Sequence, residues 1–291
     1  MKILITFLML LSSSALAAPI KVVTSFSILE DLVKNVGGNL VSITNFVPRD
    51  GDAHTYQPTT QDVRALSDAN IVFTNGLGLE AWFEKLAKNA ASKAQIVTLS
   101  SGLKPQKISV GEETGETDPH MWWNLQNTIA YTQKIAATLQ KINPKNSSVY
   151  QKNAAQYIKT LSNLDTWAKL EVQKIPVKNR VLVTNHDALG YFAARYGFKI
   201  LGTVIPSGAT EREASAKETA QLIDAIKANN VRALFTENIV NPKLAKAIAS
   251  ETGAKIAPPL YTDALGALGS SGETFAKAFR YNVITIVKAL K

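Results

Sequence analysis

Histidine occurs only three times in this chain of 291 residues, and each occurrence lies within two residues of an aspartate. The three segments are Asp52-Ala53-His54, Asp118-Pro119-His120 and His186-Asp187. A neutral imidazole is the commonest metal ligand among side chains and suits Zn, Mn, Fe, Cu and Ni. A single histidine is more often a surface or hydrogen-bonding residue. The metal hypothesis therefore depends on whether the three histidines meet.

Several of these polar residues follow segments that we predict to be strands. His54 lies in the loop after a strand at 40–47, and His186 follows a strand at 181–184. Two carboxylates follow later strands in the same way, Glu237 and Asp263. In open parallel sheets, ligands bind beyond the carboxyl ends of the strands. An aspartate there is often only a turn or cap residue, so the convergence carries more weight than any one position.

Three imidazoles and one carboxylate form a four-coordinate set that suits Zn²⁺. A bidentate or second carboxylate would let the same set hold Mn²⁺ or Fe²⁺. The sequence contains no HExxH motif, no G-x-S-x-G elbow and no cysteine, and the glycines at 76 and 78 lack the third glycine and the lysine of a phosphate loop. These absences favour metal binding over nucleophilic catalysis or phosphate binding.

Strand and helix signals alternate twice along the chain, which predicts an α/β fold with parallel sheets. We expect two lobes flanked by helices and joined by one long rigid helix, which would bridge them. The expected domains are residues 18–143 for the first lobe, 144–178 for the linking helix and 179–291 for the second lobe. The predicted strands are 20–26, 40–47, 70–74, 95–99, 181–184, 199–204, 231–236 and 255–260. The predicted helices are 28–36, 58–67, 79–89, 125–142, 147–173, 190–196, 211–229, 242–252 and 274–290.

The N-terminus is typical of an export signal. A basic start at Lys2 precedes an apolar run and an Ala-x-Ala pattern ending at Ala17, which predicts a signal peptide over 1–17. An uncleaved anchor is the alternative. Because acylation of an export signal needs a cysteine and the chain has none, we expect a periplasmic protein without a lipid anchor or disulfides.

The net charge of +9 comes from dispersed lysines. Without an arginine-rich block or alternating aromatic and basic residues, this charge favours a solvated surface and no nucleic-acid partner. We expect a monomer.

Five segments in this order resemble the solute receptors of bacterial zinc and manganese ABC importers, over nearly the whole mature length. They are Gly51-Asp52-Ala53-His54-Thr55-Tyr56-Gln57-Pro58, Asp118-Pro119-His120-Met121-Trp122, Asn185-His186-Asp187-Ala188-Leu189-Gly190-Tyr191-Phe192, Phe235-Thr236-Glu237 and Leu260-Tyr261-Thr262-Asp263-Ala264-Leu265-Gly266.

The resemblance implies a single divalent ion in the cleft between the lobes. His54 and His120 would be ligands from the first lobe, and His186 and Asp263 ligands from the second. Glu237 would orient a ligand, as carboxylates beside metal-bound imidazoles do, and Arg212 would hold a carboxylate nearby. The protein would deliver Zn²⁺, or alternatively Mn²⁺, to an ABC transporter permease without catalysing a reaction.

Two departures from the family pattern bear on the choice of metal. Gln57 stands where relatives often have Glu, and the loop 101–118 is acidic but lacks the histidines of many zinc-specific members. A histidine at the third ligand position favours zinc, although some manganese-binding relatives share it.

Two other functions would use the same residues or the same fold. A secreted metallohydrolase would use the same residues with Glu237 as general base. A receptor for a metal chelate, such as a siderophore or corrinoid, would have a wide cleft and would not need His54.

Overall fold

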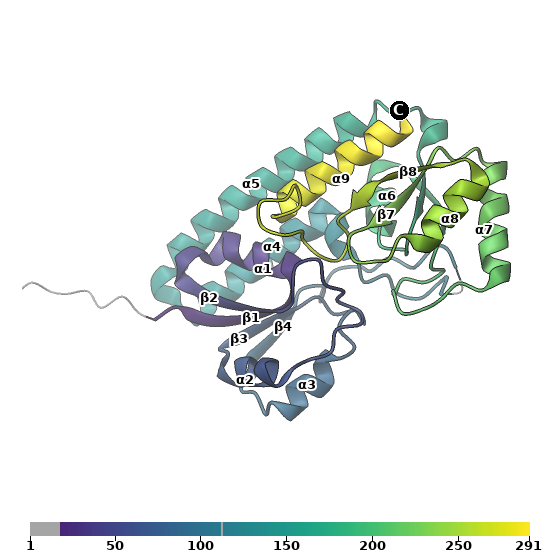
Figure 1. Cartoon of the computed structure of the whole chain (residues 1–291). Coiled ribbons are helices and arrows are strands. Elements are labelled where there is room, and N and C mark those ends of the chain that lie inside the picture. Colours follow the sequence, from purple (N-terminus) through teal and green to yellow (C-terminus); the bar gives the residue numbers. More distant parts are fainter. Residues whose placement is uncertain (1–17, 112) are drawn as a thin grey trace, which may run out of the picture.

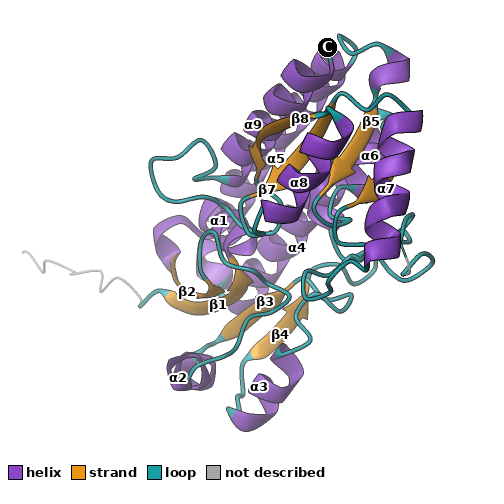
Figure 2. Ribbon diagram, turned by 45° about the vertical axis from the view of Figure 1, so that its right-hand side comes forward, coloured by secondary structure: helices purple, strands orange, loops and turns teal. Residues whose placement is uncertain are grey.

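Two four-stranded parallel sheets form the centres of two lobes in the computed structural model, which describes residues 18–111 and 113–291 (Figures 1 and 2). The predicted signal peptide, 1–17, lies outside the described residues. The first sheet has the order β2-β1-β3-β4 and the second β6-β5-β7-β8. The strands are β1 (Ile20–Phe26), β2 (Val41–Val47), β3 (Ile71–Thr74), β4 (Gln95–Thr98), β5 (Val181–Thr184), β6 (Lys199–Thr203), β7 (Ala233–Glu237) and β8 (Lys255–Leu260). The predicted α/β architecture is confirmed.

Helices cover both sheets, and the longest runs alongside the two lobes (Figure 1). The α-helices are α1 (Ser27–Gly37), α2 (Thr60–Asp68), α3 (Phe83–Asn89), α4 (Leu125–Ile142), α5 (Ser147–Val172), α6 (Gly190–Tyr196), α7 (Ala216–Ala228), α8 (Lys243–Thr252) and α9 (Phe275–Leu290). Single 3₁₀ turns are η1 (Gly38–Leu40), η2 (Met121–Trp123), η3 (Pro144–Asn146) and η4 (Val177–Asn179). Within the described part of the chain, no helix is long and apolar enough to cross a membrane.

The helix α5 has 26 residues and packs against α1, α4, α6 and α9. At 1.5 Å per residue it is about 39 Å long, which is long enough to run beside both sheets. Its buried face includes Tyr150, Tyr157, Leu164 and Val172 along its whole length. This helix matches the predicted segment 147–173 almost to the residue.

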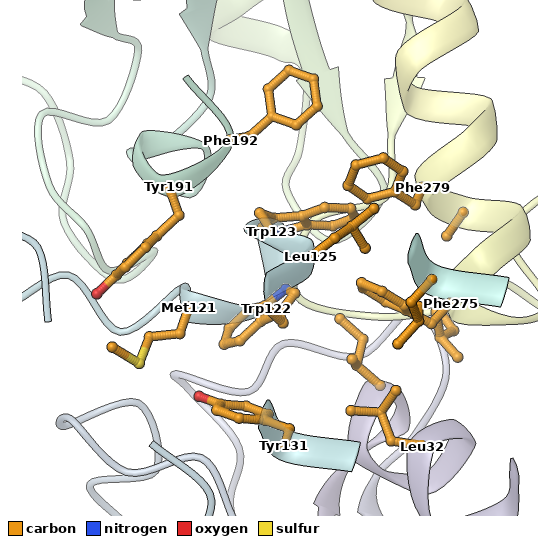
Figure 3. Close-up of a cluster of buried hydrophobic side chains, with 14 of the residues drawn as sticks. Leu32, Met121, Trp122, Trp123, Leu125, Tyr131, Tyr191, Phe192, Phe275 and Phe279 are labelled. Atoms are coloured by element: carbon orange, nitrogen blue, oxygen red, sulfur yellow. The ribbon is translucent and has the colours of Figure 1, made fainter. Parts of the chain in front are cut away.

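One of three hydrophobic clusters in the described part of the chain contains buried residues of both lobes. The two tryptophans of η2 lie at its centre, and both are buried (Figure 3). Trp123 stacks on Phe279 of α9 with ring centroids 5.9 Å apart, and Trp122 packs against Phe26 at the end of β1 at 5.0 Å. Because one apolar cluster is shared, the lobes have little freedom to separate as independent bodies.

Two helices, α3 and α7, start four or five residues later than we predicted. The helix expected at 79–89 begins at Phe83, because buried Glu80 instead accepts hydrogen bonds from the backbone N–H groups of Asn75 and Gly76. The helix expected at 211–229 begins at Ala216, where Ser215 and Glu218 form a capping box.

Candidate metal centre

Three histidines and one aspartate meet between the lobes. They are His54 from the loop after β2, His120 before η2, His186 after β5 and Asp263 after β8. One potential ligand atom from each lies within 4.8 Å of the others. Asp263 is central: its Oδ2 lies 3.1 Å from His54 Nε2 and 3.0 Å from His186 Nε2, and its Oδ1 lies 3.6 Å from His120 Nε2.

The backbone turns that present the two first-lobe histidines are alike. The His54 N–H donates to Asp52 Oδ1 at 2.9 Å, and the His120 N–H donates to Asp118 Oδ1 at the same distance. An aspartate that accepts the N–H two residues later stabilises a tight turn. The repeated Asp-x-His spacing therefore has a structural cause, because it fixes the backbone of each histidine.

Asp118 also fixes the ring of His120. Its Oδ1 accepts a hydrogen bond from His120 Nδ1 at 2.8 Å, which leaves Nε2 directed at the cluster. Such a carboxylate sets the tautomer and raises the basicity of a metal-binding imidazole. Asp118 belongs to a predicted motif, but this role was not predicted for it, although its spacing from His120 was the available signal.

Glu237 is the carboxylate that lies beside the ring of His186. Its Oε2 lies 2.6 Å from His186 Nδ1 and accepts a hydrogen bond from Thr262 Oγ1, while its Oε1 accepts from the His186 backbone N–H. Glu237 is thus engaged on both oxygens and contacts the side of the ring away from Asp263. The role predicted for Glu237, orienting a metal ligand, stays a prediction that these contacts support.

The loop that carries Asp263 is held from the first lobe. Both indole N–H groups, of Trp122 and Trp123, donate to the carbonyl oxygen of Thr262, at 3.2 and 3.1 Å. The Trp122 ring also lies against the His120 ring, with centroids 5.4 Å apart. These tryptophans therefore connect His120 of one lobe with the Asp263 loop of the other.

Charge is concentrated at the cluster. Burial opposes the charged form of His120, but Asp263 and Asp118 raise its pKa to about 9. Burial likewise opposes a charged His186, and Glu237 and Asp263 raise its pKa well above its ordinary value. Burial would raise the pKa of Asp263, yet His186 and His120 hold it well below its usual range.

Two ligand atoms at the centre have no hydrogen-bond partner among the described residues: His120 Nε2 and Asp263 Oδ1. Both belong to side chains that are fully buried. Buried polar atoms normally find a partner, so these positions fit an additional group between the side chains. A divalent cation satisfies lone pairs of imidazole and carboxylate together.

Three other predicted features lie outside this cluster. Arg212 contacts Glu218 at 2.7 Å and donates to the carbonyl of Pro206. The carboxylate in these contacts is therefore that of Glu218 on α7, which is not part of the cluster. Gln57 is exposed. In the loop 101–118, Glu113 accepts hydrogen bonds from Ser207 Oγ and the Gly208 N–H, both at 2.8 Å, so this loop docks on the second lobe.

Two parallel-sheet lobes with a compact set of metal-ligating side chains between them define a substrate-binding receptor of the metal-importer class. The sequence profile of the family described as "zinc-uptake complex component A periplasmic" (ZnuA) matches residues 22–289, and the chain belongs to this family. Its members are the substrate-binding components of metal ABC transporters.

Individual relatives match over nearly their whole length. The manganese-binding lipoprotein MntA of Halalkalibacterium halodurans is 34% identical over 271 residues, covering 93% of this chain and 88% of that protein. The metal ABC transporter substrate-binding lipoprotein FimA of Streptococcus parasanguinis is 34% identical over 285 residues, covering 96% and 92%.

Solved structures agree with the two-lobed fold. The periplasmic zinc-binding protein TroA of Treponema pallidum superposes with a TM-score of 0.87 at 29% identity, covering 94% of this chain and 99% of that one. The Mn-bound periplasmic metal-binding protein of Candidatus Liberibacter asiaticus gives a TM-score of 0.83 at 30% identity, covering 93% and 99%.

Proposed function

We propose that this protein is a periplasmic receptor that captures one divalent metal ion and delivers it to the permease of an ABC importer. His54, His120, His186 and Asp263 would be the ligands. The observation that carries the proposal is the convergence of these four side chains, from four distant segments, on one buried point between the lobes. Both lobes supply ligands, so binding and lobe contact would depend on each other.

We propose Zn²⁺ as the preferred ion, with Mn²⁺ as the alternative. Three imidazole nitrogens and one carboxylate oxygen are the usual donors of a four-coordinate zinc site. Binding of Asp263 through both oxygens would raise the coordination number, which suits Mn²⁺ better. Relatives named for manganese and for zinc both occur, so family membership alone leaves the metal open.

The two alternative functions fit the geometry less well. A hydrolase would need Glu237 free to act as a base, whereas both of its oxygens accept hydrogen bonds. A chelate receptor would need a wide cleft, whereas the ligand atoms approach within 4.8 Å of one another. The spacing favours a bare ion.

We further propose that the chain is exported, that its signal peptide is cleaved near Ala17, and that the mature protein acts as a monomer without a lipid anchor. The relatives MntA and FimA are named lipoproteins, but this sequence has no cysteine that could carry the lipid. The intact mass of protein released from the periplasm tests this: an unmodified mass starting at Ala18 is expected, and an added lipid mass would contradict it.

The metal assignment is tested by titrating Zn²⁺ and Mn²⁺ against a chelator of known affinity. We expect one ion per chain and tighter binding of zinc, with binding lost in His120→Ala and kept in Thr55→Ala, which changes an exposed neighbour of His54. Cells that depend on this receptor should likewise take up zinc in preference to manganese. Tighter binding of manganese would reverse the metal assignment, and unchanged binding in His120→Ala would refute the site.

A further inference from the structure

One ligand of the first lobe, His120, is positioned by groups of the second lobe. The connection runs through Asp118, whose Oδ1 holds both the backbone N–H and the Nδ1 of His120. Asp118 is 1% exposed, and its other oxygen, Oδ2, has no hydrogen-bond partner among the described residues. The surroundings of Oδ2 therefore decide how firmly this carboxylate is fixed.

Gly190, the first residue of α6, closes the space beside that oxygen. A Cβ added at this glycine would lie 2.6 Å from Asp118 Oδ2, closer than such atoms approach in proteins. The backbone of Gly190 does not have a positive φ, so no strained conformation requires a glycine there. The close approach of Asp118 is the reason that only glycine fits.

The next residue, Tyr191, forms hydrogen bonds with the backbone of the same segment. Its hydroxyl donates to the carbonyl of Asp118 at 2.9 Å and accepts from the Gln106 N–H at 2.8 Å. Gln106 and Asp118 are themselves joined, because the Asp118 N–H donates to the Gln106 carbonyl at 3.1 Å. The hydroxyl of a second-lobe tyrosine thus links the two ends of the loop that leads to His120.

The first lobe holds the other side of this segment. Buried Asn75 donates to the carbonyl of Pro119 at 2.9 Å and accepts from the Tyr131 hydroxyl at 2.7 Å. The Asp118-Pro119-His120 backbone is therefore held between Asn75 on one side and Tyr191 on the other. Only the contacts from α6 would be lost if the second lobe moved away.

We propose that Gly190 and Tyr191 are positioning residues for metal binding: they fix Asp118, and through it the ring of His120, only while the lobes are together. The inference rests on the proposed metal-receptor function. Its consequence is that even a small local displacement of the second-lobe segments from the first lobe weakens the site twice. The ligands His186 and Asp263 withdraw, and His120 loses the support that aims its Nε2.

The test compares matched substitutions in full-length mature protein, with Zn²⁺ as the probe and a competing chelator. Gly190→Ala should lower the zinc affinity about 10–100-fold, the usual effect of disturbing the partner of a metal-bound imidazole. Gly202→Ala is the control, because its Cβ would meet Leu222 of the same lobe at 2.7 Å, away from the cluster. Its zinc affinity should equal that of wild type.

Tyr191→Phe tests the same role without adding an atom. We expect a loss of about 3–10-fold in zinc affinity, the size of the lost hydrogen bond to the Asp118 carbonyl. Tyr196→Phe is its control: Tyr196 also lies on α6, and its hydroxyl donates to Asp165 at 2.7 Å instead. If Gly190→Ala does not fold, the comparison of Tyr191→Phe with Tyr196→Phe still tests the positioning role.

Two further measurements separate positioning from a general loss of structure. The visible absorption spectrum of the Co²⁺-loaded protein should shift in Gly190→Ala and Tyr191→Phe and stay unchanged in both controls. In an Asp118→Ala background, Gly190→Ala should cause no further loss, because the crowded oxygen is gone.

Equal zinc affinity in the test and control variants, with His120→Ala still defective, would overturn this inference and leave the receptor function standing. A full additional loss from Gly190→Ala in the Asp118→Ala background would also overturn it. Absence of divalent metal binding by the wild-type protein would overturn the inference and the proposed function together.

Discussion

At the scale of single residues, protons and metal compete for the same atoms. The pKa of His120 is raised to about 9: burial opposes the charge, and Asp263 and Asp118 outweigh it. An imidazole must lose its proton before its nitrogen can bind an ion. Zinc binding should therefore release protons at neutral pH, because His120 and His186 both have raised pKa values.

This competition predicts the pH dependence of affinity. Below the pKa of His120, each unit fall in pH should lower the apparent zinc affinity about 10-fold per displaced proton. Competition titrations between pH 6 and pH 8, with calorimetry in buffers of different ionisation enthalpy, would count the protons released. An affinity independent of pH over this range would contradict the protonated resting state.

The carboxylate of Glu237 should matter through its charge as well as its hydrogen bonds. Glu237 Oε2 lies 2.6 Å from His186 Nδ1. Glu237→Gln keeps an acceptor oxygen at this position but removes the negative charge. We expect a folded protein with zinc affinity lower by about 10-fold or more. Chelator competition measures this. Unchanged affinity would show that the charge of Glu237 contributes nothing to the site.

At the scale of secondary-structure elements, an ion pair joins the long helix to the second lobe. Asp165 of α5 accepts hydrogen bonds from Arg195 Nε at 2.6 Å and from the Tyr196 hydroxyl at 2.7 Å, both on α6. Burial would raise the pKa of Asp165, but the hydrogen bonds from Arg195 and Tyr196 lower it to about 2. The ordinary value is 3.8, so the folded protein holds this carboxylate ionised to lower pH than the unfolded chain.

The sign of the pH effect follows from this lowered pKa. The stabilisation is fully present above the unfolded value and is lost as the pH falls toward 2. Asp165→Asn should lower the free energy of unfolding by about 2–3 kcal/mol at pH 7, and its loss of stability between pH 5 and pH 2 should be shallower than that of wild type.

Urea unfolding across this pH range would measure both effects. Glu171→Gln is the control on the same helix, because it breaks a more exposed pair with Lys174, at 2.6 Å, and should cost less than about 1 kcal/mol. If the free energy of unfolding falls equally between pH 5 and pH 2 in Asp165→Asn and in wild type, the lowered pKa of Asp165 is contradicted.

Hydrophobic periodicity predicted the alternation of strands and helices well, because each sheet is buried between helices. The start of α7 was predicted wrongly at 211, although Ser215 and Glu218 have the spacing of a capping box that marks it. The start of α3 was not readable from the sequence, because it depends on Glu80 reaching the backbone at Asn75. The four cluster residues were identified from motifs, whereas the roles of Gly190 and Tyr191 depend on contacts between lobes that no local pattern records.

At the scale of the whole molecule, the shared core should limit domain motion. The helix α5 lies along both lobes, and Trp123 of the first-lobe segment stacks on Phe279 of α9 (Figures 1 and 3). We therefore expect release of the ion through movement of loops rather than a wide hinge opening. Small-angle X-ray scattering should give the same radius of gyration with and without zinc. A clear expansion of the metal-free protein would contradict this view.

The most direct test of the central claim, that four side chains from both lobes form one metal site, is a crystal structure of the zinc-loaded protein with anomalous diffraction at the zinc edge. The account predicts one strong peak between the lobes, about 2.0–2.2 Å from Nε2 of His54, His120 and His186 and from a carboxylate oxygen of Asp263. A peak elsewhere, or an ion held by only one lobe, would contradict it.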